Sequence, residues 1–531
     1  MGNKKIVIIG LDGGTWDVLG PVCDQNLMPH LNRFRQEGCW GVLRSVHPPI
    51  TPAAWVSFMT GQHPGRHGIF GFQKYDPATH RTHLTNSTHI PIESIWQKLS
   101  RHHKRVVAIG IPMTYPPMPV NGYLVTGFET PSIDCDFTYP PEFKYEILDQ
   151  IPDFKYQRRS RRKQLSDLNH FREYIKWLKR QAEQSVEIMQ LAMAKDSWDV
   201  AMVHINSFDE LSHPLFRLLD IRRDSSSDTR AEMIPSYYHD LDTIIGRLCQ
   251  IAETHEAVVF IVSDHGVQLK QGTLYPNTLL QQHHYLKTYS KMRLRWDRML
   301  SKYLLHFSRN RRLVRRNNRH RLWKQIQWKH TRAFIPETNI YANLYLHMQN
   351  KQPQGIVEPA EASTLLEEIR VCFQEQVGPK NELLFPLVAR PQELYELTER
   401  IEHLPDLMIV PREGFEMRSR LSDSVFHLDD HNNSYVGTHS MKGMFAAMGP
   451  FIQGGKKVNA KLIDVTPTVL GELKLPVSKD MDGRIINEIF CDPLSVTQES
   501  SPLKDRKLRH EFSEGENVEI ENRLIDLGYL G

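Results

Sequence analysis

IVIIGLDGG, residues 6–14, decides the fold of this chain. Its first part is a β-branched apolar run, which predicts a buried strand, and its end is an Asp-Gly-Gly turn. Helix-like stretches separate it from further short apolar runs, most of which end in polar residues. This alternation predicts an α/β fold with a largely parallel central sheet flanked by helices on both faces. The further runs are RVVAIGI (105–111), WDVAMVHIN (198–206), EAVVFIVS (256–263), DLMIV (406–410) and MFAAMG (444–449).

The composition of the 531 residues is that of a globular protein, with 40% hydrophobic and 24% charged residues. A net charge of +4 is too small to indicate nucleic acid binding by itself. No apolar run approaches the roughly 20 residues that span a bilayer, and the first run, of about five residues, is too short for a signal peptide. We therefore expect a cytoplasmic protein, either free or peripheral to a membrane. The six cysteines form no CxxC pair, so we expect neither a disulfide framework nor a zinc ribbon.

The expected organisation is one catalytic domain, residues 1–490, with two basic helical insertions at about 140–190 and 275–335. The insertions contain FKYQRRSRRKQ and SRNRRLVRRNNRHRLWKQIQWKH. We favour solvated insertions on the active-site side of the sheet, and contact with an anionic partner such as nucleic acid or a membrane remains the alternative. Residues 491–531 are expected to be a polar tail that ends in a short docking helix. No oligomeric state follows from the sequence.

Aspartate and histidine residues stand at or near the ends of the predicted strands. Each alone is typical of a turn or of a structural histidine. Together, three of each at one edge of a sheet suit two divalent ions with mixed carboxylate and imidazole ligands. Two ions about 4 Å apart can hold the attacking and leaving oxygens of a displacement at phosphorus. The six residues are Asp12, Asp209, His213, Asp264, His265 and His439.

PPITPAAW, residues 48–55, places a single hydroxyl between two prolines. The local pattern predicts that Thr51 caps a helix and that Pro52 is its first residue. The strand-end cluster suggests a second interpretation, because a metal ion can turn a threonine hydroxyl into a nucleophile. The helix would then point its N-terminus at a phosphate. Both interpretations stay open on these residues alone.

In their order along the chain, these motifs resemble the alkaline phosphatase superfamily, and most closely its type I phosphodiesterase/nucleotide pyrophosphatase branch. The resemblance extends from the first strand to about Gly483 and is weakest in the second basic insertion. The ending RLIDLGYL is similar to the C-terminal helix of soluble family members. The matching stretches are LDGGTWDVL, MPHLNRFRQEG, PPITPAAWVSFMTGQHPGRHGIFGF, INSFDELSH, VSDHG, GTHSMKGMFAAMGP and DVTPTVLGELKLPVSKDMDG.

The resemblance implies an alkaline-phosphatase-like fold and a two-metal hydrolase of phosphoric esters, acting on a small-molecule, lipid or nucleotide substrate. It implies two divalent ions, usually zinc and sometimes manganese, and a phospho-enzyme at Thr51 that water hydrolyses. One ion would be held by Asp209, His213 and His439, and the other by Asp12, Asp264 and His265.

The chain departs from the family pattern shortly after HGI, residues 67–69. Nucleotide pyrophosphatases place an asparagine there, which donates to a phosphate oxygen. An ungapped match puts Phe72 at that position, and Gln73 is the weak candidate to replace the donor. The sulfatase pattern is excluded because no arginine follows Thr51 at the required spacing. A phosphotransferase, a phosphomonoesterase and a catalytically inactive binding protein remain alternatives to a phosphodiesterase.

Overall fold

The computed structural model divides the chain into two compact units, and the first contains every predicted site residue. The first unit comprises residues 1–74, 84–270 and 432–531, and the second comprises 75–83 and 271–431. Residue 490, where the sequence predicts the end of the catalytic domain, lies within the first unit and not at a boundary between the two. The residues that the structure describes are 4–156, 165–223, 227–289, 323, 325–336, 340–397, 404–429, 436–500, 510–527 and 529.

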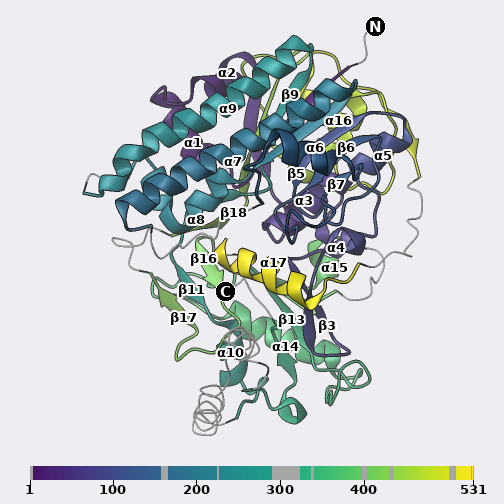
Figure 1. The fold of residues 1–531 in the computed structure, drawn as a ribbon. Helices are drawn as coiled ribbons and strands as arrows, with labels where there is room; N and C mark the ends of the chain where they lie inside the picture. The colour runs from purple at the N-terminus through teal and green to yellow at the C-terminus, as the bar shows by residue number, and fades with distance from the viewer. Residues whose placement is uncertain are drawn as a thin grey trace. The chain divides into compact units, whose positions relative to one another are not determined.

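The first unit is built on a sheet of ten described strands (Figure 1). The predicted fold class, a mostly parallel sheet between helices, is confirmed. The order of the strands is β20 (Lys456–Lys457), β2 (Cys39–Arg44), β19 (Lys442–Met448), β9 (Val258–Val262), β1 (Ile6–Leu11), β8 (Val200–Ile205), β5 (Val106–Ile111), β6 (Gly122–Thr126) and β7 (Thr138–Tyr139), with β21 (Ala460–Lys461) also paired to β2.

Strand directions bring several carboxyl ends to one edge of this sheet. β1 is parallel to β8 and β9, with Ile9 opposite Val203 and Ile261. β19 is antiparallel to both β9 and β2, so β2 points in the same direction as β1. The segment MFAAMG is therefore an antiparallel strand, and DLMIV is not in this sheet at all. It forms β15 (Leu407–Val410) in the second unit.

The two faces of the sheet bury different residues of each strand, because side chains alternate along a strand. In β1, Val7, Ile9 and Leu11 contribute to one core, whereas Ile6 and Ile8 contribute to the other. Helices cover both faces (Figure 1). The first face carries α1 (Trp16–Asp24), α2 (Pro29–Glu37), α7 (Leu168–Lys195), α8 (Ser207–Leu219) and α9 (Ile234–Thr254), and the second carries α3 (Thr51–Thr60), α5 (Ile95–Arg101), α16 (Val465–Glu472) and α17 (Glu514–Asp526).

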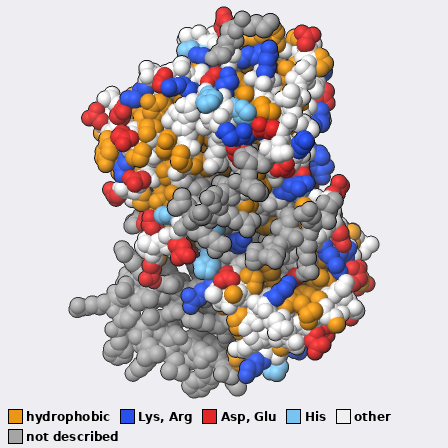
Figure 2. Space-filling model, turned by 90° about the vertical axis from the view of Figure 1, so that its right-hand side faces the viewer, with side chains coloured by type: hydrophobic (Ala, Val, Ile, Leu, Met, Phe, Trp, Pro, Cys, Tyr) orange, Lys and Arg blue, Asp and Glu red, His pale blue; other side chains and the backbone are white. Residues whose placement is uncertain are grey.

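Helix α7 shows that the first expected insertion is largely a core element. Phe171, Leu178 and Val186 recur at helical spacing and are buried, so this face packs on the sheet and is not solvated. The basic runs fall mainly at 157–164 and 290–322, which lie outside the described residues. On the face drawn in Figure 2, the described lysine and arginine side chains stand among aspartate and glutamate. No helix in the described part of the chain combines the length and apolar character needed to cross a bilayer.

The second unit contains small sheets and short helices. Its larger described sheet is antiparallel, in the order β12 (Ala333–Phe334), β13 (Ala342–Leu346), β15, β14 (Leu387–Ala389). Its other elements are β11 (Gly272–Leu274), α10 (Pro276–Gln282), α14 (Ala362–Gln374), α15 (Pro391–Leu394), β16 (Phe415–Met417) and β17 (Phe426–Leu428). The remaining α-helices and strands among the described residues are α4 (Pro64–His67), β3 (Gln73–Asp76), β4 (Arg81–Leu84), α6 (Phe143–Gln150), β10 (Gly266–Leu269), β18 (Gly437–Ser440), β22 (Val477–Ser478) and β23 (Gln498–Glu499).

Candidate active site

Seven polar residues singled out in the sequence meet at the carboxyl edge of the central sheet. The parallel strands β1, β8 and β9 end there, so the residues that follow them come together. Strand β18 approaches the same place through its antiparallel pairing with β10, and helix α3 begins there after β2. The seven are Asp12 after β1, Thr51 at the start of α3, Asp209 and His213 in α8, Asp264 and His265 after β9, and His439 in β18.

Asp12, Asp264 and His265 form the first buried group. His265 Nε2 lies 3.2 Å from Asp264 Oδ2 and 3.6 Å from Asp12 Oδ1. The other ring nitrogen, Nδ1, lies 3.2 Å from the backbone oxygen of Gly266. A proton on Nδ1 would donate to that carbonyl, which leaves the lone pair of Nε2 facing the two carboxylates. This is the arrangement that a metal-binding histidine requires.

Asp209, His213 and His439 form the second group. Asp209 and His213 share one face of α8, as their spacing predicts, and Asp209 Oδ2 lies 3.3 Å from His213 Nε2. His439 Nε2 lies 3.1 Å from His213 Nε2, and its Nδ1 lies 2.9 Å from the carbonyl of Pro49. If Nδ1 of His439 donates to that carbonyl, its Nε2 has a lone pair that points at another ring nitrogen. A cation between the two rings would satisfy both.

Three carboxylate oxygens in these groups are buried and accept no hydrogen bond from any described residue. They are Asp12 Oδ1, Asp209 Oδ1 and Asp264 Oδ2. Leaving such an oxygen unpaired in a protein interior is costly, and a bound cation removes the cost. Each group thus combines carboxylate and imidazole ligand atoms within 4.8 Å of one another. The residues present therefore fit two divalent ions.

The electrostatics of the seven residues also favour bound cations. Burial raises the pKa of Asp264 well above its ordinary value, and the neighbouring Asp12 and Asp209 raise it further. Burial also acts to raise the pKa of Asp209, but the neighbouring His213 holds it well below its usual range. Burial lowers the pKa of His439 far below the ordinary value, so this ring is neutral, as a ligand must be.

Gly13 allows the first strand to turn directly beneath Asp209. Its φ of +68° lies in the left-handed region, which residues with a side chain rarely adopt. A Cβ at this position would lie 2.9 Å from both Cβ and Oδ1 of Asp209. The backbone N–H of Gly13 also donates to Asp264 Oδ1 over 3.2 Å, which orients that carboxylate.

Thr51 is the first residue of α3 and not its cap. Ile50 occupies the cap position in an extended conformation, and no side chain caps the helix. Pro52 is still accommodated, because its missing N–H would have no partner in the first turn. The hydroxyl of Thr51 lies 3.4 Å from His265 Nε2 and donates to the hydroxyl of Tyr529 over 3.1 Å. The side chain is fully buried and faces the two carboxylate–histidine groups.

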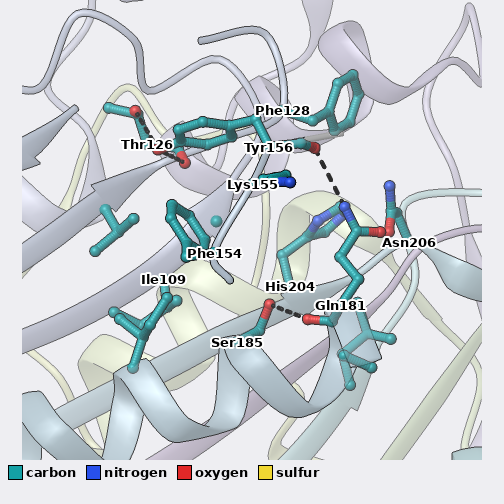
Figure 3. Close-up of a pocket in the computed structure, with 15 residues that line it drawn as sticks. Ile109, Thr126, Phe128, Phe154, Lys155, Tyr156, Gln181, Ser185, His204 and Asn206 are labelled. Atoms are coloured by element: carbon teal, nitrogen blue, oxygen red, sulfur yellow. Dashed lines mark hydrogen bonds between the residues drawn. The ribbon is translucent and has the colours of Figure 1, made fainter. Parts of the chain in front are cut away.

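His204 and Trp55 both bind one carboxylate oxygen of Asp12, and the sequence did not reveal either residue. His204 Nε2 lies 2.9 Å from Asp12 Oδ2, and Trp55 Nε1 donates to the same oxygen over 3.3 Å. His204 also lines a small pocket, together with Phe128, Tyr156 and others (Figure 3). Two donors on one oxygen fix the orientation of the carboxylate and leave its second oxygen, Oδ1, toward His265.

We expect His204→Phe to weaken the binding of zinc by about 10–100-fold, because Asp12 loses the donor that orients it. His204→Gln, which can still donate, serves as the matched control and should lose less. Titration calorimetry of the metal-stripped protein with zinc measures both. Unchanged affinity in the phenylalanine variant would contradict the orienting role.

Tyr529 was also missed as a site residue, although it lies in the motif RLIDLGYL. Its hydroxyl donates to Asp209 Oδ2 over 3.0 Å and accepts from Thr51. Burial and the nearby Asp209 raise the pKa of Tyr529 well above its ordinary value, so the hydroxyl stays protonated. Phe72, at the position of the expected asparagine, packs its ring against Tyr529 with 5.0 Å between centroids. Gln73 begins β3, and its role in substrate binding stays a prediction.

Comparisons with known proteins match the predicted family and fold. A family model of type I phosphodiesterases/nucleotide pyrophosphatases matches residues 6–442. Human ectonucleotide pyrophosphatase/phosphodiesterase 5 is 14% identical, with a TM-score of 0.51 over 92% of this chain and 100% of its own. The murine protein of the same name is 14% identical, with a TM-score of 0.49 over 89% and 95%. At this identity the human structure shows likeness of fold alone. No curated protein sequence matches the chain.

Proposed function

This chain belongs to the type I phosphodiesterase/nucleotide pyrophosphatase family, and from that premise we propose that it hydrolyses phosphodiesters through a phospho-threonine intermediate at Thr51. Membership makes the chain a hydrolase of phosphoric esters that uses divalent metal ions. The observation that carries the proposal is the place of the Thr51 hydroxyl. It has no capping role, and it lies beside His265 of one candidate metal group and one hydroxyl away from Asp209 of the other.

We assign the two buried groups to two ions. When bound, the ions supply positive charge that lowers the pKa of the attacking hydroxyl and offsets the charge on the phosphoryl group. Zinc fits these sites better than manganese, because half of the ligands are imidazoles and each group offers only three protein ligands. One ion is held by Asp209, His213 and His439, and the other by Asp12, Asp264 and His265.

The chain's own residues then perform the transfer in two displacements. Thr51 gives its hydroxyl proton to solvent, and its Oγ1 attacks phosphorus as the bond from phosphorus to the leaving alkoxide breaks; solvent protonates that alkoxide. Water next attacks phosphorus as the bond from phosphorus to Oγ1 breaks, and one proton of that water restores the threonine hydroxyl while the phosphate monoester leaves. Helix α3 begins at Thr51, so its N-terminus points at the phosphoryl group. Pro52 has no N–H, and Ala53 is the first residue after Thr51 with a backbone donor to offer.

The substrate class is tested by comparing two chromogenic esters. We expect metal-stripped protein to be inactive and zinc to restore hydrolysis of bis-p-nitrophenyl phosphate. The diester should be cleaved about tenfold faster or more than p-nitrophenyl phosphate, at equal subsaturating concentrations. Manganese in place of zinc provides the second metal arm and should restore less activity.

Each other outcome points to a specific alternative. A faster monoester would make the protein a phosphomonoesterase on the same fold. Release from neither ester with either metal would contradict the proposal and favour a phosphotransferase or a binding protein. Nucleotide specificity is not part of the proposal, because Phe72 has no donor at the position where the family resemblance expects one.

A further inference from the structure

Tyr529 brings a hydroxyl into the reaction centre from a segment far from the rest of the site in sequence. This hydroxyl lies 3.1 Å from Thr51 Oγ1 and 3.0 Å from Asp209 Oδ2. Tyr529 is 478 positions from Thr51 along the sequence. A hydroxyl this close to Thr51 Oγ1 is within reach of a group that Thr51 would attack.

The helix that precedes Tyr529 is firmly anchored. Arg523 of α17 is 8% exposed, and its guanidinium donates to the backbone oxygens of Phe128, Thr130 and Pro131. Leu524 in the same helix is buried in the core on this side of the sheet. Removing a guanidinium from water is costly unless such hydrogen bonds replace the lost hydration. The helix is thus an integral part of the unit, which argues against a loosely docked tail.

Two aromatic rings hold the ring of Tyr529. Phe128 stacks on it with 5.9 Å between centroids and 5° between planes, and Phe72 packs on it at 5.0 Å with a tilt of 55°. These contacts restrict both side-chain torsions, so the hydroxyl is held in one place before substrate binds. A donor fixed in advance pays no reorganisation cost during the reaction, which is the condition for strong stabilisation of a transition state.

The position of the hydroxyl suits a phosphoryl oxygen. Attack requires phosphorus about 3–3.5 Å from Thr51 Oγ1, and the non-bridging oxygens then lie around that line. The Tyr529 hydroxyl is hydrogen-bonded to both Thr51 Oγ1 and Asp209 Oδ2, so an oxygen of a phosphoryl group attacked by Thr51 would come within its reach. A cation held by Asp209 would compete with the tyrosine proton for the negative charge of this carboxylate, so the proton can turn to the phosphoryl oxygen. Phe72, which packs on the ring, has no polar atom that could donate instead.

We propose that the Tyr529 hydroxyl donates a hydrogen bond to a non-bridging oxygen of the phosphoryl group as it is transferred to Thr51. This inference rests on the proposed function and adds a catalytic residue to it. The hydroxyl contributes little to binding of the ground-state ester and more as negative charge builds on the oxygens. The role therefore predicts a change in kcat more than in KM.

Tyr529→Phe tests the inference, because it keeps the ring and its packing and removes only the hydroxyl. We expect kcat for bis-p-nitrophenyl phosphate to fall by about 10²-fold with KM nearly unchanged. Calorimetry of the zinc-loaded protein should show orthovanadate, which mimics the transition state, binding about 10²-fold more weakly, and inorganic phosphate changing far less. Tyr238→Phe is the matched control, because that buried hydroxyl donates to the carbonyl of Leu219 in a different part of the unit.

The outcomes separate this inference from the proposed function. A Tyr529→Phe enzyme faster than wild type would show that the tyrosine obstructs the site, and equal rates and vanadate affinities would show that only its ring matters. Either result overturns the inference. A wild-type protein that hydrolyses neither ester instead overturns the proposed function. If the variant melts at a lower temperature, its vanadate affinity still tests the inference, because binding of vanadate does not depend on turnover.

Discussion

Thr51→Ala reduces the hydrolysis of bis-p-nitrophenyl phosphate by about 10⁴-fold or more, with the fold and the binding of zinc retained. The substitution removes the atom to which phosphorus is transferred. The cost in stability is expected to be about 1 kcal/mol, because Thr51 caps nothing and loses one hydrogen bond to Tyr529. Activity and stability are therefore expected to separate cleanly at this residue.

Two further variants sharpen this result. Thr51→Ser keeps a hydroxyl and should retain activity within about tenfold of wild type. Thr60→Ala is the matched control, because Thr60 is buried in the same helix and its hydroxyl donates to the carbonyl of Val56. Acid quenching of the wild-type reaction, followed by mass spectrometry, should find a p-nitrophenyl phosphoryl group on the peptide that contains Thr51. A Thr51→Ala protein with more than a tenth of wild-type activity would remove Thr51 as the nucleophile.

Several of the candidate metal-binding residues are predictable because the apolar run of a strand stops at a recognisable residue and a polar residue follows it. The apolar run of β1 stops at Leu11 and that of β9 at Val262, so Asp12 and Asp264 are recognisable as residues beyond the strands. The spacing of Asp209 and His213 predicts one helical face, which α8 provides. The parallel pairing of these strands then brings the residues together without any further information.

The residues that the sequence did not reveal lack such a local signal. His204 is inside β8, where its neighbours are apolar, and only the pairing of β8 with β1 places it near Asp12. Trp55 is one more apolar residue in a helix that is buried on every side. Tyr529 needs the docking of α17, which depends on contacts with Phe128 and Phe72 hundreds of residues away. Such positions are set by tertiary packing, which local periodicity does not encode.

Strand direction is not encoded locally either. An apolar run such as MFAAMG predicts a strand but neither its partner nor its direction. In the structure a short connection from β18 leads directly into β19, which pairs antiparallel with both β9 and β2. DLMIV likewise pairs with β13 and β14 in the second unit.

Asp264→Asn is expected to abolish hydrolysis and yet to stabilise the metal-free protein. Asp264 is fully buried near Asp12 and Asp209, and its Oδ2 accepts no hydrogen bond from the described residues. An asparagine keeps the oxygen that accepts from Gly13, removes the negative charge, and places an amide 3.2 Å from His265 Nε2, to which it can donate. We expect the free energy of unfolding without metal to rise by about 1–3 kcal/mol.

The same substitution should remove the stabilisation that zinc gives to the wild type. Thermal melting with chelator and with zinc measures both effects, and activity should fall by about 10³-fold or more. Asp464→Asn is the matched control, because both oxygens of that buried aspartate accept backbone N–H groups, from Lys461 and Arg484. It should destabilise by about 1–2 kcal/mol, since an amide cannot replace both acceptors. If Asp264→Asn instead lowered the melting temperature without metal, the carboxylate would stabilise the metal-free fold and the prediction would be wrong. A rise would show that this buried charge is retained for the cation and at the expense of stability.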